Sequence, residues 1–178
     1  PAAQAAAPGE AAGHFSTGEY RILSVDFLDE SGRPATVFRF GRPMSVRVAY
    51  ERLAPGEPEF SCGLAVGVTS AQDRQAVMYF NTNYPHSDEE AARYFEAPFR
   101  QYKGARGVVE GRIPYLQLKP GDYIVSLGIL PNAPDFHQFY EYHHLAYRIA
   151  VARNGYPEPA VFYAMVDWTN GDMPGAAR

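Results

Sequence analysis

The chain has 178 residues, 46% of them hydrophobic, which is enough to build the core of one domain and excludes a wholly disordered chain. Its formal net charge is −4, so it lacks the basic surface on which nucleic-acid binding depends. Cys62 is the single cysteine, which excludes a disulfide within the chain and fits a reducing compartment. No apolar run reaches the roughly 20 residues that a membrane-spanning helix needs.

The two ends of the chain differ in composition from its middle. Residues 1–14 are rich in Ala, Pro and Gly, carry no hydrophobic periodicity and lack the basic start and apolar centre of a signal peptide. We predict a linker over 1–14, a folded domain over 15–170 and a short tail over 171–178. The linker composition and the absence of an initiating Met lead us to expect a piece of a longer protein.

Between these ends, apolar residues alternate with polar or small ones, which is the period-two pattern of half-buried strands. About nine short strands separated by turns that contain Gly or Pro predict an all-β fold, an antiparallel two-sheet β-sandwich of the jelly-roll or immunoglobulin-like kind. The strands are expected over 23–27, 38–40, 44–51, 62–68, 77–81, 109–113, 123–129, 145–151 and 161–168. The side chains expected in the core are Leu23, Val25, Phe27, Val46, Val48, Leu64, Val66, Val125, Leu127, Tyr147 and Ile149.

One stretch, 84–107, does not follow the strand pattern. Ser87 is followed by Asp88, Glu89 and Glu90 and then by apolar residues, which predicts an N-capped helical turn or two. The stretch is too long for a hairpin connection. We therefore predict a long, partly helical insertion, and long ordered loops on a rigid scaffold often carry function.

The chain lacks the common signatures of catalysis. It has neither a Gly-rich phosphate loop nor a Gly-x-Ser-x-Gly nucleophile motif. Cys62 lies within an apolar strand pattern, an unsuitable place for a nucleophile. The carboxylates at 88–90 fit the first turn of a helix better than an acid–base pair. We predict a non-catalytic domain that has no cofactor.

Histidines are concentrated in the stretch 136–144. An extended segment there would present His137, Glu141 and His143 on one side, and zinc takes such ligands. A second ligand pair with recognisable spacing is missing elsewhere, so we predict no metal site. The stretch is then either a polar aromatic loop or a segment whose side chains hydrogen-bond a ligand directly.

Aromatic residues give the stronger functional signal. Rings surround the start of the insertion and the histidine stretch, and sugars bind by laying their C–H faces on such rings while amide and imidazole groups hydrogen-bond their hydroxyls. Small residues on one face of the strand at 62–68 (Gly63, Ala65 and Gly67) indicate close approach of a backbone or a ligand, and offer a second location. The predicted carbohydrate site consists of Tyr79, Asn81, Asn83, Tyr84, Tyr140, Tyr142 and His143.

An ordered series of motifs resembles a known family. The segments are 15–25, 29–33, 40–46 and 79–82, followed by the most specific one, Gly111-Arg-Ile-Pro-Tyr-Leu-Gln-Leu-Lys-Pro-Gly-Asp-Tyr123. Together they resemble the C-terminal carbohydrate-binding domain of the ATPase subunit of O-antigen ABC transporters, the Wzt type. The insertion at 84–103 is longer than that family leads us to expect, and no binding residue is carried over from it.

The resemblance implies a cytoplasmic sandwich domain that forms a homodimer and binds the exported bacterial polysaccharide. The upstream domain of the full-length transporter would contact the membrane permease and hold the protein at the inner membrane. The main hypothesis is therefore non-catalytic recognition of an O-antigen-like polysaccharide, which selects it for export. The alternative is a ligand-free dimerisation or structural module attached to an enzyme of polysaccharide biosynthesis.

Overall fold

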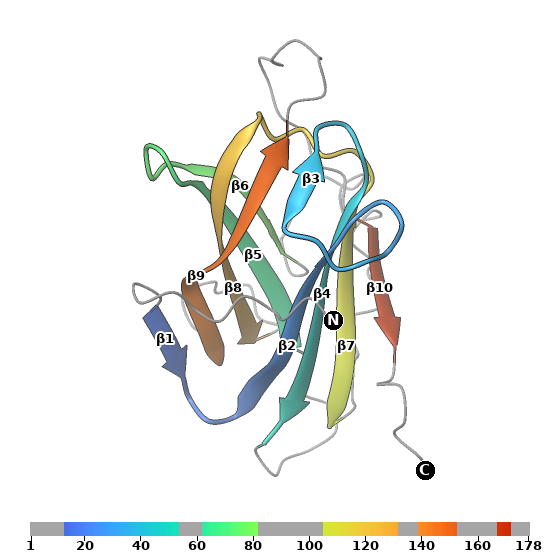
Figure 1. Cartoon of the computed structure of the whole chain (residues 1–178). Helices are drawn as coiled ribbons and strands as arrows, with labels where there is room; N and C mark the ends of the chain where they lie inside the picture. Colours follow the sequence, from blue (N-terminus) through green and yellow to red (C-terminus); the bar gives the residue numbers. More distant parts are fainter. Residues whose placement is uncertain (1–12, 54–61, 82–104, 132–138, 153–166, 172–178) are drawn as a thin grey trace, which may run out of the picture.

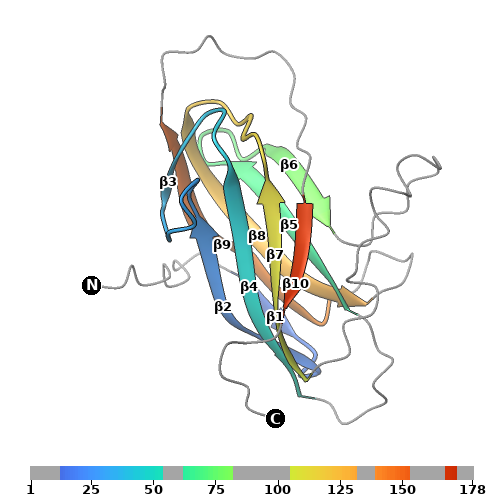
Figure 2. The ribbon, with the colours of Figure 1, turned by 90° about the vertical axis from the view of Figure 1, so that its right-hand side faces the viewer.

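The computed structural model describes residues 13–53, 62–81, 105–131, 139–152 and 167–171. These residues form ten strands in two sheets, and the predicted two-sheet antiparallel β-sandwich is confirmed (Figure 1). Figure 1 shows the two sheets side by side, and in Figure 2 the four-stranded sheet lies in front of the larger one. The described part of the chain contains no helix with the length and apolar character to cross a membrane.

The larger sheet has six strands. Its order is β1-β9-β8-β5-β6, with antiparallel pairing throughout, and β3 pairs in parallel with β9 beyond the end of β1. The strands are β1 (Gly13–Ser16), β3 (Val37–Arg39), β5 (Cys62–Ser70), β6 (Ala76–Asn81), β8 (Gly121–Pro131) and β9 (Glu141–Ala152).

The smaller sheet has four antiparallel strands in the order β10-β7-β4-β2. They are β2 (Tyr20–Leu28), β4 (Met44–Arg52), β7 (Arg106–Ile113) and β10 (Asp167–Gly171). Asp29 builds the turn after β2: its carboxylate accepts hydrogen bonds from the backbone N–H groups of Ser31 and Arg33, and Gly32 has a φ of 75°. A further hydrogen bond from the Ser31 hydroxyl, together with these two, keeps the pKa of Asp29 below its ordinary value.

The core lies between the two sheets. Val48 of β4 and Val125 and Leu127 of β8 are fully buried there. Every side chain predicted for the core is buried except Leu23, which is 40% exposed. The prediction for Leu23 was wrong because β2 has a bulge: Ile22 pairs with Tyr50, but Ser24 pairs with the next residue of β4, so the alternation shifts by one residue.

Several predicted boundaries also change. β1 begins at Gly13, inside the range expected to be a linker, because 13–16 pairs with the start of β9. The last strand covers Asp167–Gly171, whereas most of the predicted 161–168 lies outside the described residues. The helix predicted in the insertion lies outside them too, within 82–104.

Candidate functional site

The outward face of the six-stranded sheet carries a row of residues in register. From β6 to β1 the row is Asn81, Ala65, Gly128, Tyr142 and Phe15, each paired with its neighbour. Directly paired residues of antiparallel strands lie on the same side of a sheet. Because the residues next to them on β5 and β8 belong to the core, this row faces away from the core.

A second row lies beside the first. It contains Tyr79 of β6, Gly67 of β5 and Ser126 of β8. Tyr79 is 52% exposed, and its ring lies over Gly67, where an added Cβ would be 3.9 Å from the ring. The two rows therefore contain a patch of small residues on β5 and β8, with the Tyr79 ring on the β6 side and the Tyr142 ring on the β9 side.

A pair of stacked rings stands at the β8–β9 side of this patch. Phe139 and Tyr142 stack with their ring centroids 4.5 Å apart and an interplanar angle of 18°. The Phe139 ring occupies the space that a side chain at Gly128 would need, since an added Cβ would overlap it. The Tyr142 hydroxyl is 3.1 Å from Nδ1 of His144, which holds the outer end of the tyrosine.

We call the rings of Phe15, Tyr79, Phe139 and Tyr142 the aromatic face. Phe15 and Tyr79 are exposed, and Phe139 and Tyr142 are half-buried. Of the small residues expected to permit a close approach, Gly67 is in ordinary van der Waals contact with the Tyr79 ring, and the approach of a backbone or a ligand to this strand stays a prediction. The Phe139 ring lies much closer to Gly128. An exposed aromatic surface that is flat and fixed from below can stack against the apolar face of a ligand.

The structure divides the predicted carbohydrate site among three locations. Tyr79 and Tyr142 lie on the outward face, and Asn81 pairs with Ala65 at the end of β6. Tyr140 is buried, and its ring stacks on Tyr20 with the centroids 4.9 Å apart, so it packs within the core and not on the outward face. His143 pairs with Leu127 and points toward the core side. Asn83 and Tyr84 lie outside the described residues.

Two residues of the aromatic face were missed from the sequence. Phe15 lies next to Tyr142 only because β1 pairs with β9, a contact between distant parts of the chain that local alternation does not reveal. Phe139 depends on Gly128 for its place. A glycine within an otherwise apolar strand was the available signal for it.

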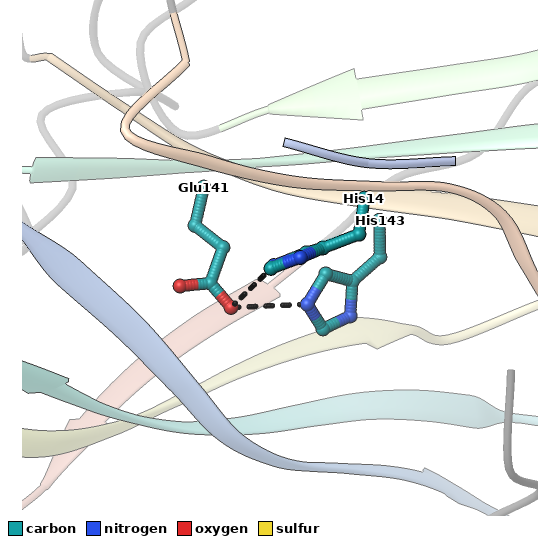
Figure 3. A group of neighbouring side chains, drawn as sticks. All are labelled: His14, Glu141 and His143. Carbon is teal, nitrogen blue, oxygen red and sulfur yellow. Dashed lines mark hydrogen bonds and ion pairs between the residues drawn. The ribbon is translucent and has the colours of Figure 1, made fainter. Parts of the chain in front are cut away.

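A second group of side chains lies on the opposite side of β1 and β9. Oε1 of the buried Glu141 accepts a hydrogen bond from the Ile22 N–H at 3.1 Å. The same oxygen is 3.0 Å from Nε2 of His143 and 3.6 Å from Nε2 of His14 (Figure 3). The ligand atoms of the three titratable residues all lie within 4.8 Å of one another. We call His14, Glu141 and His143 the imidazole–carboxylate cluster.

A tyrosine completes the surroundings of this cluster. Between Leu127 and Val125 the register of β9 shifts, and Leu145 takes a φ of 50° while its N–H donates to Oγ of Ser126 at 2.8 Å. The bulge brings Tyr147 beside His143, and the tyrosine hydroxyl hydrogen-bonds Nδ1 of His143. Burial, and to a smaller extent the Glu141 charge, raise the pKa of Tyr147, so its hydroxyl stays protonated.

Fold and site together define a β-sandwich domain with an outward aromatic face, the architecture of many binding modules. The family model of the Wzt C-terminal domain matches residues 12–167, and the chain belongs to that family. The chain is also similar to a crystal structure of the C-terminal domain of Wzt, with a TM-score of 0.63 and 12% identity over 98% of this chain and 92% of the other. A comparison with curated proteins gave no match.

Membership of this family gives the chain a role in O-antigen export, as the motifs at 15–123 implied. The similarity to the solved domain, at its low identity, bears on the fold alone. The assignment of residues to a ligand therefore depends on which side chains lie on each face of the six-stranded sheet in this chain.

Proposed function

We propose that this domain binds an O-antigen-like bacterial polysaccharide on the aromatic face and thereby selects it for export by an ABC transporter. The observation that carries the proposal is the position of Tyr79 and Tyr142, two predicted site residues from different strands, on one outward face. Within the proposal the domain holds its ligand and catalyses no step.

The spacing of the rings suits an extended ligand. Tyr79 is on β6 and Tyr142 is on β9, with β5 and β8 between them. Three strand spacings amount to about 14 Å, so the two tyrosines would contact different sugar residues of one chain. Asn81 follows Tyr79 on the same strand and pairs with Ala65 in the outward row; its amide would hydrogen-bond hydroxyl groups of the ligand.

Affinity follows from the kind of contact. Stacking on a few exposed rings predicts a dissociation constant in the micromolar range or weaker, about −8 kcal/mol or less favourable. A neutral glycan gains little from charge, so binding should depend weakly on salt. A homodimer would present two sites to one polysaccharide and strengthen binding by avidity.

The proposal also covers the setting of the domain, that is, its partners and its location in the cell. The partners would be the polysaccharide, a second copy of the chain and, through an upstream domain, the membrane permease. The location would be cytoplasmic and peripheral to the inner membrane. Membership of the Wzt C-terminal domain family supports this setting.

Titration calorimetry with the cognate polysaccharide tests the proposed site. Tyr79→Ala and Tyr142→Ala should each weaken binding by about 1–3 kcal/mol, because each removes one stacking surface. Tyr115→Ala is the matched control, since Tyr115 is exposed to a similar extent (49%) and its ring contacts Phe40 away from the aromatic face. Wild-type affinity in both test variants, with their folds intact, would remove the site from this face.

A further inference from the structure

The imidazole–carboxylate cluster is separate from the aromatic face and takes no part in the proposed glycan binding. We propose that His14, Glu141 and His143 bind a divalent transition-metal ion, preferentially Zn²⁺, which fastens β1 to β9. Two imidazoles and one carboxylate are a ligand set that zinc takes in proteins. The ligand set considered from the sequence contained His137, which lies outside the described residues. His14 provides the third ligand in its place.

The two distances from the carboxylate oxygen to the imidazoles are already close to those around a metal ion, and all three ligand atoms lie within 4.8 Å of one another. Zinc binds imidazole nitrogen and carboxylate oxygen at about 2.0–2.2 Å, which places tetrahedral ligand atoms about 3.3 Å apart. Oε1 of Glu141 lies 3.0 Å from Nε2 of His143 and 3.6 Å from Nε2 of His14. Figure 3 shows both imidazoles directed at the same carboxylate oxygen. Small movements of side chains are enough to close the three atoms around an ion.

Two of the ligands are held in place by the fold. The buried Glu141 is fixed by the Ile22 N–H from the opposite sheet, and the His143 ring is fixed by its hydrogen bond to Tyr147. Outer hydrogen bonds of this kind orient the ligands of natural metal sites and set which imidazole nitrogen binds. With Nδ1 of His143 engaged by Tyr147, Nε2 is the nitrogen left to face the metal.

The third ligand, His14, leaves the site open to solvent and connects the ion to β1. The His14 side chain is 59% exposed, so the site is open to solvent on the β1 side. β1 has four residues, and among the described strands it pairs with β9 alone. A metal bridge from His14 to Glu141 and His143 would therefore hold this short edge strand in register. One coordination position would remain for water, as in other zinc sites with three protein ligands.

Zinc binding to tag-free, chelator-treated protein tests the proposal. We expect saturable binding of one Zn²⁺ per chain in competition with a chromophoric chelator, and a rise in the thermal unfolding midpoint when Zn²⁺ is added. Co²⁺ should give a visible absorption spectrum of tetrahedral type. His14→Gln should weaken Zn²⁺ binding by at least about tenfold and abolish the thermal shift. Because His14 is exposed, this variant should fold.

His144→Gln is the matched control. His144 is the neighbouring exposed histidine of the same strand as His143, and it faces the other side of the sheet toward Tyr142. Its replacement should leave the Zn²⁺ affinity unchanged. The proposal is overturned if the wild-type chain binds no Zn²⁺ saturably, if His14→Gln binds as tightly as the wild type, or if His144→Gln loses as much affinity as His14→Gln.

Discussion

Truncation of one leucine in the centre of the sandwich gives a quantitative test of the fold. Leu127 has no exposed surface; it pairs with Val66 of β5 on one side and with His143 of β9 on the other. Leu127→Ala removes the equivalent of three buried methylene groups, worth about 2.4 kcal/mol at about 0.8 kcal/mol each. The cavity left behind adds to this loss, and the expected total is about 2–5 kcal/mol.

Urea unfolding followed by circular dichroism would measure the loss, and the thermal midpoint should fall as well, by about 2–4 °C per kcal/mol for a domain of this size. Leu23→Ala is the matched control, because it is the same substitution at a residue that the sequence pattern also assigned to the core. With Leu23 40% exposed, its truncation should cost less than about 1 kcal/mol. A loss below about 1 kcal/mol for Leu127→Ala, or equal losses for the two variants, would refute the assignment of these faces.

Three further predictions concern other parts of the molecule. Gly128→Ala should destabilise the domain by about 1–3 kcal/mol in the same unfolding assay, because its Cβ overlaps the Phe139 ring; a neutral result would mean that Phe139 does not rest there. The pKa of Asp29 is lowered in the folded protein, so the stability that this carboxylate contributes is present above its ordinary pKa of 3.8 and is lost as the pH falls through the lowered pKa. Carboxyl titration by NMR should find the pKa of Asp29 below 3.8, and a pKa at or above 3.8 would contradict the turn geometry. Light scattering should give the mass of a dimer, because β2, β6 and β10 are edge strands among the described residues; a strict monomer at high concentration would count against it.

Local alternation was enough to predict the sandwich, since each strand buries one face and period two is a property of neighbouring residues. It failed at Leu23 because a bulge adds one residue to β2, and a bulge leaves no mark in the hydrophobic pattern. The strand at Gly13–Ser16 was missed for a different reason. All four of its residues are exposed, so it has no buried face to produce an alternation.

The candidate site was predictable in part. Tyr79 and Tyr142 reach one face because each sits at an outward position of a regular strand. Tyr140 has the same parity as Tyr142, but it lies before β9 begins, at a bend where its ring turns into the core against Tyr20. His143 follows Tyr142 directly in β9, so the two side chains point to opposite faces of the sheet and cannot line the same face.

Only two of the three residues of the imidazole–carboxylate cluster could be grouped from the sequence. Glu141 and His143 are two residues apart, and the sequence suggested that they share a side. Their third partner, His14, comes from a strand at the other end of the chain. Such a contact depends on the pairing of β1 with β9, and no spacing rule in a single sequence contains it.

NMR titration of the isotope-labelled domain with the cognate O-antigen polysaccharide tests most directly whether the aromatic face binds the glycan. We expect saturable amide shift changes at Gly67, Gly128 and Tyr142, beneath the aromatic face, while Val48 and Val109 in the four-stranded sheet stay unchanged. Shift changes confined to the four-stranded sheet, or none at millimolar polysaccharide, would contradict binding on the aromatic face.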